Sequence, residues 1–584
     1  MLARACGPGS PGITEIMPAD LILLHSPSVY DFRQKTILYG PVSDLIPPSP
    51  VFEMYPIGLT SIAEYLERAG YRVRIVNLAV RMLRDRSFNA EAMIKGLKAP
   101  VFGIDLHWMV HCHGAIEIAR LVKKYHPESK LLFGGFSSSY FYKELIDYPE
   151  IDYIIRGDST EEPIRQLMDS LRERKEPEKV PNLVWRDSLG KVQENPFSNV
   201  PSDLSDVMLR HYDGVMRSVL RYRDLISYLP FKDWLRYPIT AVITCRGCTH
   251  NCIICGGSAA AFRRIHQRDK PAFRTPEAVA RDVRQIERFS RGPIFILGDL
   301  LQAGEDYACQ ILDLLQKNRV KNQIIFELFS PAPSDFLHQM GLASPNFCLE
   351  ISPESHDPEI RKAIGRNYSN EALEQTLGDA LDAGCGRVDV FFMTGLTKQT
   401  PQSVMDTVDY CGYLMKKFKG DKRLSLFIAP ISPFLDPGSL AFEQPERYGY
   451  KVLFRTLEEH RQALASPSWK YSLNYETEWM DRQQIAETGY EAIGRLIRLK
   501  EKYGVISREM AEIGVRRMEA GREMMHRLDG VLSNDNCEEE LLRLKPEVDR
   551  LNAFPVSEKI QLELPVGLVK LRPWRLLWSW ATGR

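Results

Sequence analysis

Short apolar runs alternate with amphipathic stretches over residues 20–175, in the order expected for repeated strand and helix units. The predicted strands are LILLHS (21–26), RVRIV (72–76), VFGID (101–105), KLLFG (130–134) and DYIIR (152–156). Helices are predicted at 57–69, 89–97, 114–124, 139–147 and 161–173, where apolar residues recur every three or four positions. This order predicts an α/β fold with an open, doubly wound parallel sheet of the Rossmann or flavodoxin type.

A second series of strands follows a predicted linker at 176–238, which itself contains a hairpin pattern at 183–194. The predicted strands are ITAVIT (239–244), PIFIL (293–297), IIFEL (324–328), FCLEI (347–351), VDVFFM (388–393) and LSLFIA (424–429). Helical patterns lie between most of them. Residues 239–440 are therefore predicted to form a partial (β/α)6 TIM-like barrel, whose chemistry belongs at the carboxyl ends of its strands.

The two ends of the chain lack the alternation of predicted strands and helices found in its centre. Residues 1–19 are an N-terminal extension, and 441–584 form a helical and charged C-terminal appendage. Its tail carries Trp574, Trp578 and Trp580 among arginines, a composition typical of a membrane interface. A helix that docks on the protein body is the preferred interpretation, and a peripheral membrane contact is the alternative.

Composition excludes several function classes. The 76 basic and 76 acidic residues balance, so no global positive field is available for nucleic acid. No apolar run is long enough to cross a bilayer, and the first residues lack the apolar core of a secretory signal. The sequence therefore predicts a cytoplasmic protein, with a membrane-associated tail as the alternative, and no nucleic-acid partner.

Four of the 11 cysteines crowd into residues 245–255, directly after the first predicted barrel strand. Two CxxC pairs this close do not suit a zinc ribbon, and the spacing also differs from that of a closed ferredoxin cluster. The remaining interpretation takes Cys248, Cys252 and Cys255 as a CxxxCxxC triad. Such a triad holds three irons of a 4Fe-4S cluster and leaves the fourth iron open to a substrate or cofactor.

The triad and its flanks, T-x-R-G-C-x-x-N-C-x-x-C, resemble the radical SAM superfamily, and in particular its cobalamin-binding branch. The resemblance implies S-adenosylmethionine (SAM) contacts at Gly298 and Asp299, at Glu350 and Ser352 in LEISPES, and at Gly395 in FFMTGL (391–396). SPFLDPGS (432–439) resembles a strand-six loop of the superfamily. Ile254 departs from the aromatic residue common before the last cysteine. Cys245 stands where serine or threonine is more usual; we expect it not to bind iron, because a fourth cysteine would close the open site.

Residues 20–175 resemble the cobalamin-binding (B12-binding) domains that precede the barrel in that branch. The similar segments are 55–71, LLFGGFSSS (131–139) and IIRGDSTEEPIRQL (154–167). The implied cobalamin contacts are His107, Trp108, Gly134, Gly135 and Gly157. The loop after the first strand lacks the D-x-H-x-x-G pattern of histidine-ligated cobalamin, so we expect binding without a protein histidine.

Other polar residues of this domain have simpler interpretations. The group His107, His111, Cys112 and His113 is interpreted as pocket lining and a helix start in preference to a zinc site. Glu161 and Glu162 begin a predicted helix, where carboxylates favour the helix dipole. Asp299 is expected to hydrogen-bond the cofactor and to take no part in acid catalysis.

The resemblance implies a mechanism with three cofactors: a 4Fe-4S cluster, SAM and cobalamin. A low-potential donor such as ferredoxin or flavodoxin reduces the cluster, SAM yields a 5′-deoxyadenosyl radical, and methylcobalamin methylates an unactivated carbon of a small-molecule substrate. An apolar molecule or lipid is the preferred substrate. Two alternatives stay open: a cyclase, rearrangement or C–C coupling enzyme without methyl transfer, and a cobalamin-binding sensor with an inert barrel.

Overall fold

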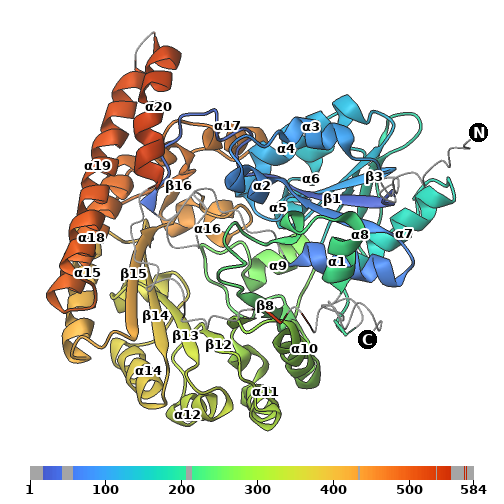
Figure 1. Cartoon of the computed structure of the whole chain (residues 1–584). Helices are drawn as coiled ribbons and strands as arrows, with labels where there is room; N and C mark the ends of the chain where they lie inside the picture. The colour runs from blue at the N-terminus through green and yellow to red at the C-terminus, as the bar shows by residue number, and fades with distance from the viewer. Residues whose placement is uncertain are drawn as a thin grey trace, which may run out of the picture.

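The computed structural model describes residues 18–41, 57–205, 214–431, 434–533 and 536–553, with Leu564, Leu571, Arg572 and Trp574. Two parallel sheets, each covered by helices, occupy the N-terminal part and the centre of the chain, and long helices of the C-terminal region stand beside the second sheet (Figure 1). Loops at the carboxyl ends of the two sheets contact each other. The predicted α/β architecture is confirmed.

The first sheet has the strand order β2-β1-β3-β4-β5-β6-β7. Its parallel strands are β1 (Leu21–His25), β2 (Val73–Asn77), β3 (Val101–Asp105), β4 (Lys130–Gly134) and β5 (Tyr153–Ile155). All five lie within a residue or two of the predicted strands. The order 2-1-3-4-5 is that of flavodoxin, which places the ligand-binding switch point between β1 and β3.

Helices cover both faces of this sheet. They are α1 (Gly58–Arg68), α2 (Leu78–Arg84), α3 (Ala90–Gly96), η2 (Met109–His111), α4 (Cys112–Tyr125), α5 (Phe136–Tyr140), α6 (Tyr142–Leu145) and α7 (Glu161–Arg172). Successive strand residues point to opposite faces, so Ile22 and Leu24 join the core with α3 and α4. Leu21 and Leu23 join a separate core with α1 and α7. Burial on both faces explains why the strands are continuously apolar.

The predicted hairpin forms, but it is part of the first sheet. β6 (Leu183–Arg186) pairs antiparallel with β5, and β7 (Val192–Glu194) pairs with β6. Helix α8 (Gly214–Tyr222) and η3 (Ile226–Tyr228) then run back over β2, where Asp224 pairs with Arg74 and Arg81. Much of the segment predicted as a linker therefore extends the first domain.

The second sheet is the predicted six-stranded half-barrel, with the order β15-β14-β13-β12-β11-β8 and only parallel pairs. Its strands are β8 (Thr240–Ile243), β11 (Ile294–Leu297), β12 (Ile324–Leu328), β13 (Cys348–Glu354), β14 (Arg387–Thr394) and β15 (Leu424–Pro430). A small ladder of β9 (Cys245–Arg246) and β10 (Ala272–Phe273) stands beside it. The helices are α9 (Ala259–His266), α10 (Pro276–Phe289), η4 (Leu300–Ala303), α11 (Glu305–Asn318), α12 (Ser334–Ala343), α13 (Pro358–Ala363), α14 (Asn370–Asp382) and α15 (Pro401–Lys417).

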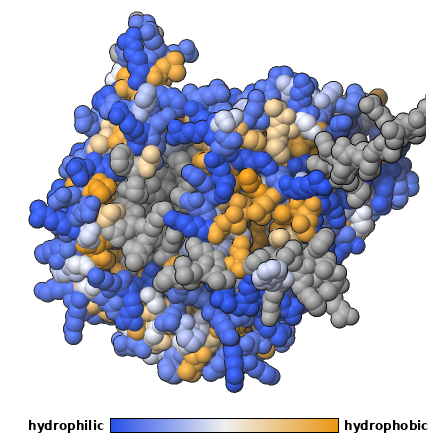
Figure 2. Space-filling view, in the orientation of Figure 1, coloured by the Kyte–Doolittle hydropathy of each residue, from blue (hydrophilic) through white to orange (hydrophobic). Residues whose placement is uncertain are grey.

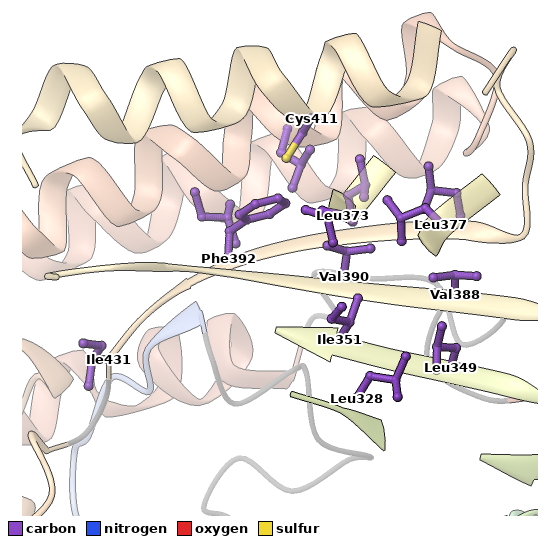
Figure 3. Packing of buried hydrophobic residues seen from close by; sticks show 14 of the residues in the cluster. Leu328, Leu349, Ile351, Leu373, Leu377, Val388, Val390, Phe392, Cys411 and Ile431 are labelled. Atoms are coloured by element: carbon purple, nitrogen blue, oxygen red, sulfur yellow. The ribbon is translucent and has the colours of Figure 1, made fainter. Parts of the chain in front are cut away.

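The two sides of the barrel strands have different surroundings. Outward residues such as Leu349, Val390 and Phe392 are buried against the helices, next to Leu373 and Cys411 (Figure 3). Inward residues alternate with them and are only half-buried, most clearly in β11, β13 and β14. Phe295, Ile325 and Cys348 also point inward, and they pack against Phe231, Tyr237 and Leu564, so part of the half-barrel interior is filled.

The C-terminal region combines a short antiparallel hairpin with long helices. Its elements are α16 (Leu440–Glu443), η5 (Glu446–Tyr448), β16 (Tyr450–Val452), α17 (Leu457–Leu464), η6 (Trp469–Ser472), β17 (Tyr475–Thr477), α18 (Arg482–Lys502), α19 (Arg508–Leu532) and α20 (Cys537–Ala553). Helix α18 packs on β15 and α15, beside the last strand of the half-barrel (Figure 1). The predicted helical appendage is thus part of the barrel core.

Helix α20 reaches back to the loop that follows β1. Asn552 accepts a hydrogen bond from the Tyr39 amide and donates one to the Ile37 carbonyl, at 3.1 and 2.8 Å. Thr36 donates to the Leu541 carbonyl at 2.8 Å. The C-terminal helices therefore fix a loop at the carboxyl end of the first sheet.

The structure bears on the predicted membrane contact through its helices and through the C-terminal tail. None of the helices it describes combines the length and the apolar character that a bilayer crossing requires. In the tail, Trp574 is 81% exposed. Trp578 and Trp580 lie outside the described residues, as do residues 1–17 and Ser432 and Pro433 of the predicted strand-six loop. A peripheral contact of the tail stays a prediction.

Candidate active site

The three predicted iron ligands lie on one loop between β8 and α9, at the carboxyl end of the half-barrel. Backbone amides point at two of the sulfurs: His250 N–H donates to Cys248 Sγ at 3.4 Å, and Gly257 N–H donates to Cys255 Sγ at 3.3 Å. Ser258 then caps α9 by accepting from the Ala261 amide. Amide donors of this kind stabilise anionic sulfur, which is what an iron-bound thiolate requires.

Close backbone approaches give this loop its shape. Gly247 has φ +103°, and a Cβ there would lie 2.9 Å from Pro271 Cα. On the opposite side, a Cβ on Gly365 would lie 2.9 Å from the Asn251 carbonyl oxygen. The Ile253 amide donates to the Ile364 carbonyl at 3.1 Å, which ties the loop to the segment after α13. Both glycines are needed because a side chain would separate these backbones.

No three His, Cys, Asp or Glu side chains among the described residues are close enough to surround a single metal ion. A cubane cluster does not need such a group, because each cysteine binds a different iron atom. Burial raises the pKa of the Cys248 and Cys252 thiols, so iron has to displace their protons on binding. The Cys245 thiol points to the Gly247 carbonyl, 3.6 Å away.

Arg366 is a site residue that the sequence motifs did not indicate. Its guanidinium pairs with Glu354 at 3.1 Å and donates to the Phe329 carbonyl at 2.8 Å. Its charge lowers the pKa of Cys248 and Cys252, against the larger effect of burial. A fixed cation beside the cysteine loop therefore favours the thiolates and the net negative charge of a thiolate-bound cluster. In the sequence Arg366 only follows Gly365 beyond the short helix α13 (Pro358–Ala363), and this pattern did not indicate a site residue.

The loop after β11 carries the predicted SAM contacts Gly298 and Asp299. Gly298 has φ +91°, and its amide donates to Glu327 at 3.0 Å. Asp299 is buried, and its two oxygens accept from the Leu301 and Phe329 amides, both at 2.9 Å. Asp299 thus holds the loops after β11 and β12 together, a role in loop shape that adds to the predicted cofactor contact.

Glu350 lies in a row of acids inside the barrel, in register with Glu327 on one side and Asp389 on the other. Burial, with repulsion from both neighbours, raises the pKa of Glu350 to about 8 and burial raises that of Asp389 to about 6. Arg387 binds Asp389 at 2.8 Å. Ser352 is half-buried two residues nearer the strand end, on the same side of β13. Glu350 is thus protonated near neutral pH in this state.

Gly395 follows β14, as the resemblance implied, and the structure gives it a packing role. Its φ is +91°, and a Cβ there would lie 2.2 Å from the Tyr475 hydroxyl. The Tyr450 hydroxyl donates to its carbonyl at 3.3 Å. The β16–β17 hairpin of the C-terminal region therefore lies directly against the strand-five loop.

The predicted cobalamin contacts gather at the carboxyl edge of the first sheet. His107 and the 43%-exposed Trp108 follow β3, and Gly134 and Gly135 end and follow β4. Gly135 has φ +116°, and a Cβ there would lie 2.6 Å from the His107 amide, so this crossing requires glycine. Gly157 follows β5 with φ +109°. The structure thus brings all five residues to one edge.

A buried histidine pair at the switch point was missed from the sequence. His25, the last residue of β1, bonds Asp105 at the end of β3 through Nδ1 at 3.0 Å. The His111 ring lies 4.8 Å from that of His25, and its Nδ1 lies 3.2 Å from the Ser26 carbonyl oxygen. Burial lowers the pKa of His111 to about 3 and of His107 to about 4, so both rings are neutral. His113 accepts from the Tyr30 amide at 3.2 Å.

The domains meet at the cysteine loop. Phe136 of α5 packs on Phe262 and His266 of α9, with ring centroids 5.4 and 4.5 Å apart. Glu161, expected to serve the helix dipole, is instead buried and paired with Arg246. Hydrophobic residues also gather near the centre of one face of the molecule, where Figure 1 labels α5 and α9 (Figure 2). The two sheet edges that carry the predicted cofactor residues therefore face a common interface.

Comparisons with known proteins agree with this arrangement. Residues 49–164 match the family model "B12 binding domain", and 242–411 match "Radical SAM superfamily". A hopanoid C-3 methylase of Methylococcus capsulatus is 26% identical over 341 residues, which cover 56% of this chain and 60% of that protein. A cytidylyl-2-hydroxyethylphosphonate methyltransferase of Streptomyces wedmorensis is 26% identical over 256 residues, 38% of this chain and 47% of that protein. The matches thus span less than two thirds of either relative.

A solved structure shows the same fold. The radical S-adenosylmethionine methyltransferase TsrM from Kitasatospora setae, with cobalamin and a [4Fe-4S] cluster bound, superposes with a TM-score of 0.55 at 16% identity. The match covers 82% of this chain and 91% of that one. The fold of most of this chain is therefore shared with that structure.

Proposed function

We propose that this chain, in which residues matching a B12-binding family model precede residues matching the radical SAM superfamily, is a cobalamin-dependent radical SAM methyltransferase acting on carbon. One observation carries this proposal. The cysteine loop lies between the carboxyl end of the barrel and the carboxyl edge of the first sheet, bonded to both. Residues suited to a cluster and to a corrin thus meet at one interface.

The cysteine loop fits a cluster with one open iron. Cys248, Cys252 and Cys255 would hold three irons, with backbone N–H groups on the sulfurs and Arg366 beside them. When bound, such a cluster supplies the electron that splits SAM into methionine and a 5′-deoxyadenosyl radical. The Gly298 loop, Ser352 and Gly395 lie at the carboxyl ends of β11, β13 and β14, where the proposal places SAM. We propose a low-potential ferredoxin or flavodoxin as the electron donor.

The first sheet fits a corrin at its carboxyl edge. Gly135 and Gly157 let neighbouring loops pack closely at this edge, beside Gly134, and Trp108 offers an exposed apolar ring. Bound cobalamin supplies a transferable methyl group. Facing it, Phe136, Phe262 and His266 exclude water from the interface, and the His25–Asp105 bond fixes the two strand ends at the switch point.

Cobalamin is expected to bind without a protein histidine on cobalt. His25 and His111 are almost fully buried, and each has a ring nitrogen at a protein oxygen. In the cob(II)alamin form, any nitrogen superhyperfine splitting in the EPR spectrum of the reconstituted protein should come from the lower base of cobalamin itself, so labelling the protein's histidines with nitrogen-15 should leave the spectrum unchanged. A splitting that disappears in His107→Ala would show that His107 binds cobalt and would contradict this expectation.

We propose an apolar small molecule as the substrate. Several inward residues of the half-barrel are apolar and half-buried, among them Ile243, Leu297, Phe391 and Met393. Apolar walls with few polar groups are typical of sites for apolar ligands. The carboxyls of Glu327 and Glu350 are polar groups at the same depth.

Methyl transfer is tested with isotope-labelled SAM. Anaerobically reconstituted protein is supplied with SAM labelled in its methyl group, a low-potential reductant and an extract of cells that lack this chain. The proposal predicts one product that carries the label and is absent from the extract incubated without protein. SAM cleavage with unlabelled new products would instead indicate cyclisation, rearrangement or coupling, and an absence of all cleavage would favour a sensor.

A further inference from the structure

Two carboxylates of the first domain reach across the domain interface to the cysteine segment, residues 245–273. Asp158 lies on the loop after β5, and Glu161 is the first residue of α7. Both side chains are buried, with 2% and 1% exposure. Asp158 precedes α7 and Glu161 begins it, and each side chain binds an arginine of the cysteine segment.

Asp158 binds Arg268, which follows α9. Arg268 Nε donates to one carboxylate oxygen at 2.5 Å, and Nη2 donates to the other at 3.0 Å. The Arg268 side chain is itself only 3% exposed, and its Nη1 donates to the Pro201 carbonyl at 3.0 Å. Burial alone would raise the pKa of Asp158, but the guanidinium holds it below its ordinary value. The pair is therefore charged and bidentate.

Glu161 binds Arg246 in the same manner. Arg246 Nη1 and Nη2 donate to its two oxygens at 3.0 and 2.5 Å. Ser61 of α1 donates to one of these oxygens at 2.8 Å. Arg246 lies two residues before Cys248, so this ion pair reaches the iron-binding loop almost directly.

The two arginines stand at the base of the cysteine segment. Arg246 of β9 is paired with Ala272 of β10, so the segment is closed into one unit by this ladder. Gly247 lies so close to Arg268 that a Cβ would meet its Cδ at 3.0 Å. A shift of either arginine would therefore move the whole cysteine loop as a body.

Neighbouring Glu162 shows what an ordinary ion pair in this helix looks like. It binds Arg165 one turn along α7, and both side chains are partly exposed. Such a partly exposed pair adds little. Glu162 also accepts from the Tyr65 hydroxyl of α1 at 2.8 Å, so these bonds stay within the first domain. By contrast, a buried charge needs its partner in good geometry, and a bidentate guanidinium–carboxylate contact fixes orientation as well as distance.

We infer that Asp158 and Glu161 are positioning residues, which set the cysteine loop at a fixed distance from the carboxyl edge of the first sheet. The inference rests on the proposed function, because the distance matters where both a cluster and a corrin are bound. The Asp158–Arg268 and Glu161–Arg246 pairs fix the position of the two cofactor sites relative to each other. Because Arg246 and Arg268 lie where the cysteine loop begins and ends, their ion pairs also fix the position of the cysteines.

The test measures the distance between the two cofactors in the reconstituted holoenzyme. Asp158→Asn, Glu161→Gln and the double variant are compared with Glu162→Gln as the matched control in the same helix. Iron and cobalamin per chain are determined first. The magnetic interaction between cob(II)alamin and the reduced cluster is then measured by EPR, because it depends on the distance between the two spins. Hydrogen exchange across residues 245–273 is the second measurement.

The inference predicts a shifted magnetic interaction in the double variant, with iron and cobalamin contents unchanged. Exchange in the cysteine segment should rise about tenfold or more, the effect of losing charge-assisted bonds. Glu162→Gln should match the wild type in both. An unchanged interaction in the double variant would overturn the inference. If that variant does not fold, Arg268→Lys decides, since it keeps the charge but loses the bidentate contact.

This outcome is separable from that of the proposed function. The interaction is measured without turnover or substrate, so it reports on the distance between the two cofactors whether or not a methyl group is transferred. A wild type that shows the coupling but transfers no label would contradict the proposed function and leave the positioning role standing.

Discussion

Replacement of Cys252 by alanine is expected to abolish reductive SAM cleavage. Two cysteines cannot hold three irons, so the loss should exceed the roughly 10–100-fold effect of removing a partner outside the ligand set. Cys252 is half-buried at the closest approach of the loop to Gly365, so alanine fits there without a clash. Iron content after anaerobic reconstitution and the yield of 5′-deoxyadenosine measure the effect.

Cys309→Ala is the matched control for this variant. Cys309 is another half-buried free cysteine, on α11 and remote from the loop in sequence. It should keep the iron content and cleavage rate of the wild type. Full cluster content in Cys252→Ala would contradict the ligand assignment, and would point to Cys245 as a replacement donor.

Gly114→Ala is expected to destabilise the first domain by about 2–4 kcal/mol. A Cβ at Gly114 would lie 1.8 Å from the Pro27 carbonyl oxygen, and the Gly114 amide donates to the Ser28 carbonyl at 3.0 Å. Helix α4 and the loop after β1 would have to separate. Because this loop leaves the switch point, cobalamin retention should fall together with the melting temperature.

Gly96→Ala provides the control for the loss of a glycine. Gly96 ends helix α3, and a Cβ there would meet nothing within 4 Å. Its substitution should stabilise the protein by about 0.4–1 kcal/mol, because alanine restricts the unfolded chain. Equal melting temperatures for Gly114→Ala and the wild type would show that the loop after β1 moves freely.

Strand positions and boundaries followed from the sequence because the signals were local, whereas the order of the strands within the first sheet was not predicted. Five strands of the first sheet and six of the barrel lie where short β-rich apolar runs predicted them. The antiparallel hairpin was also visible, but its attachment to β5 was not, since pairing partners leave no trace in a single strand's pattern. For the same reason the packing of α18 on β15 was missed.

The residues of the candidate site also fall into two groups, those predicted from the sequence and those that only the structure brought together. Residues on one short loop, the three cysteines above all, were found from their spacing. Arg366, His25 and the partners of Asp158 and Glu161 were not, because each acts through contacts over tens to hundreds of residues. Burial decides their chemistry: Glu161 was assigned to the helix dipole from its position, yet it is enclosed and bound by Arg246.

The central claim is that one iron beside Cys248, Cys252 and Cys255 lacks a protein ligand and binds SAM. Its most direct measurement is the EPR spectrum of the reduced, anaerobic protein before and after SAM is added. The account predicts a change in the g-values of the cluster signal on addition, and the same change with a SAM analogue that resists cleavage. An identical spectrum with and without SAM would contradict it.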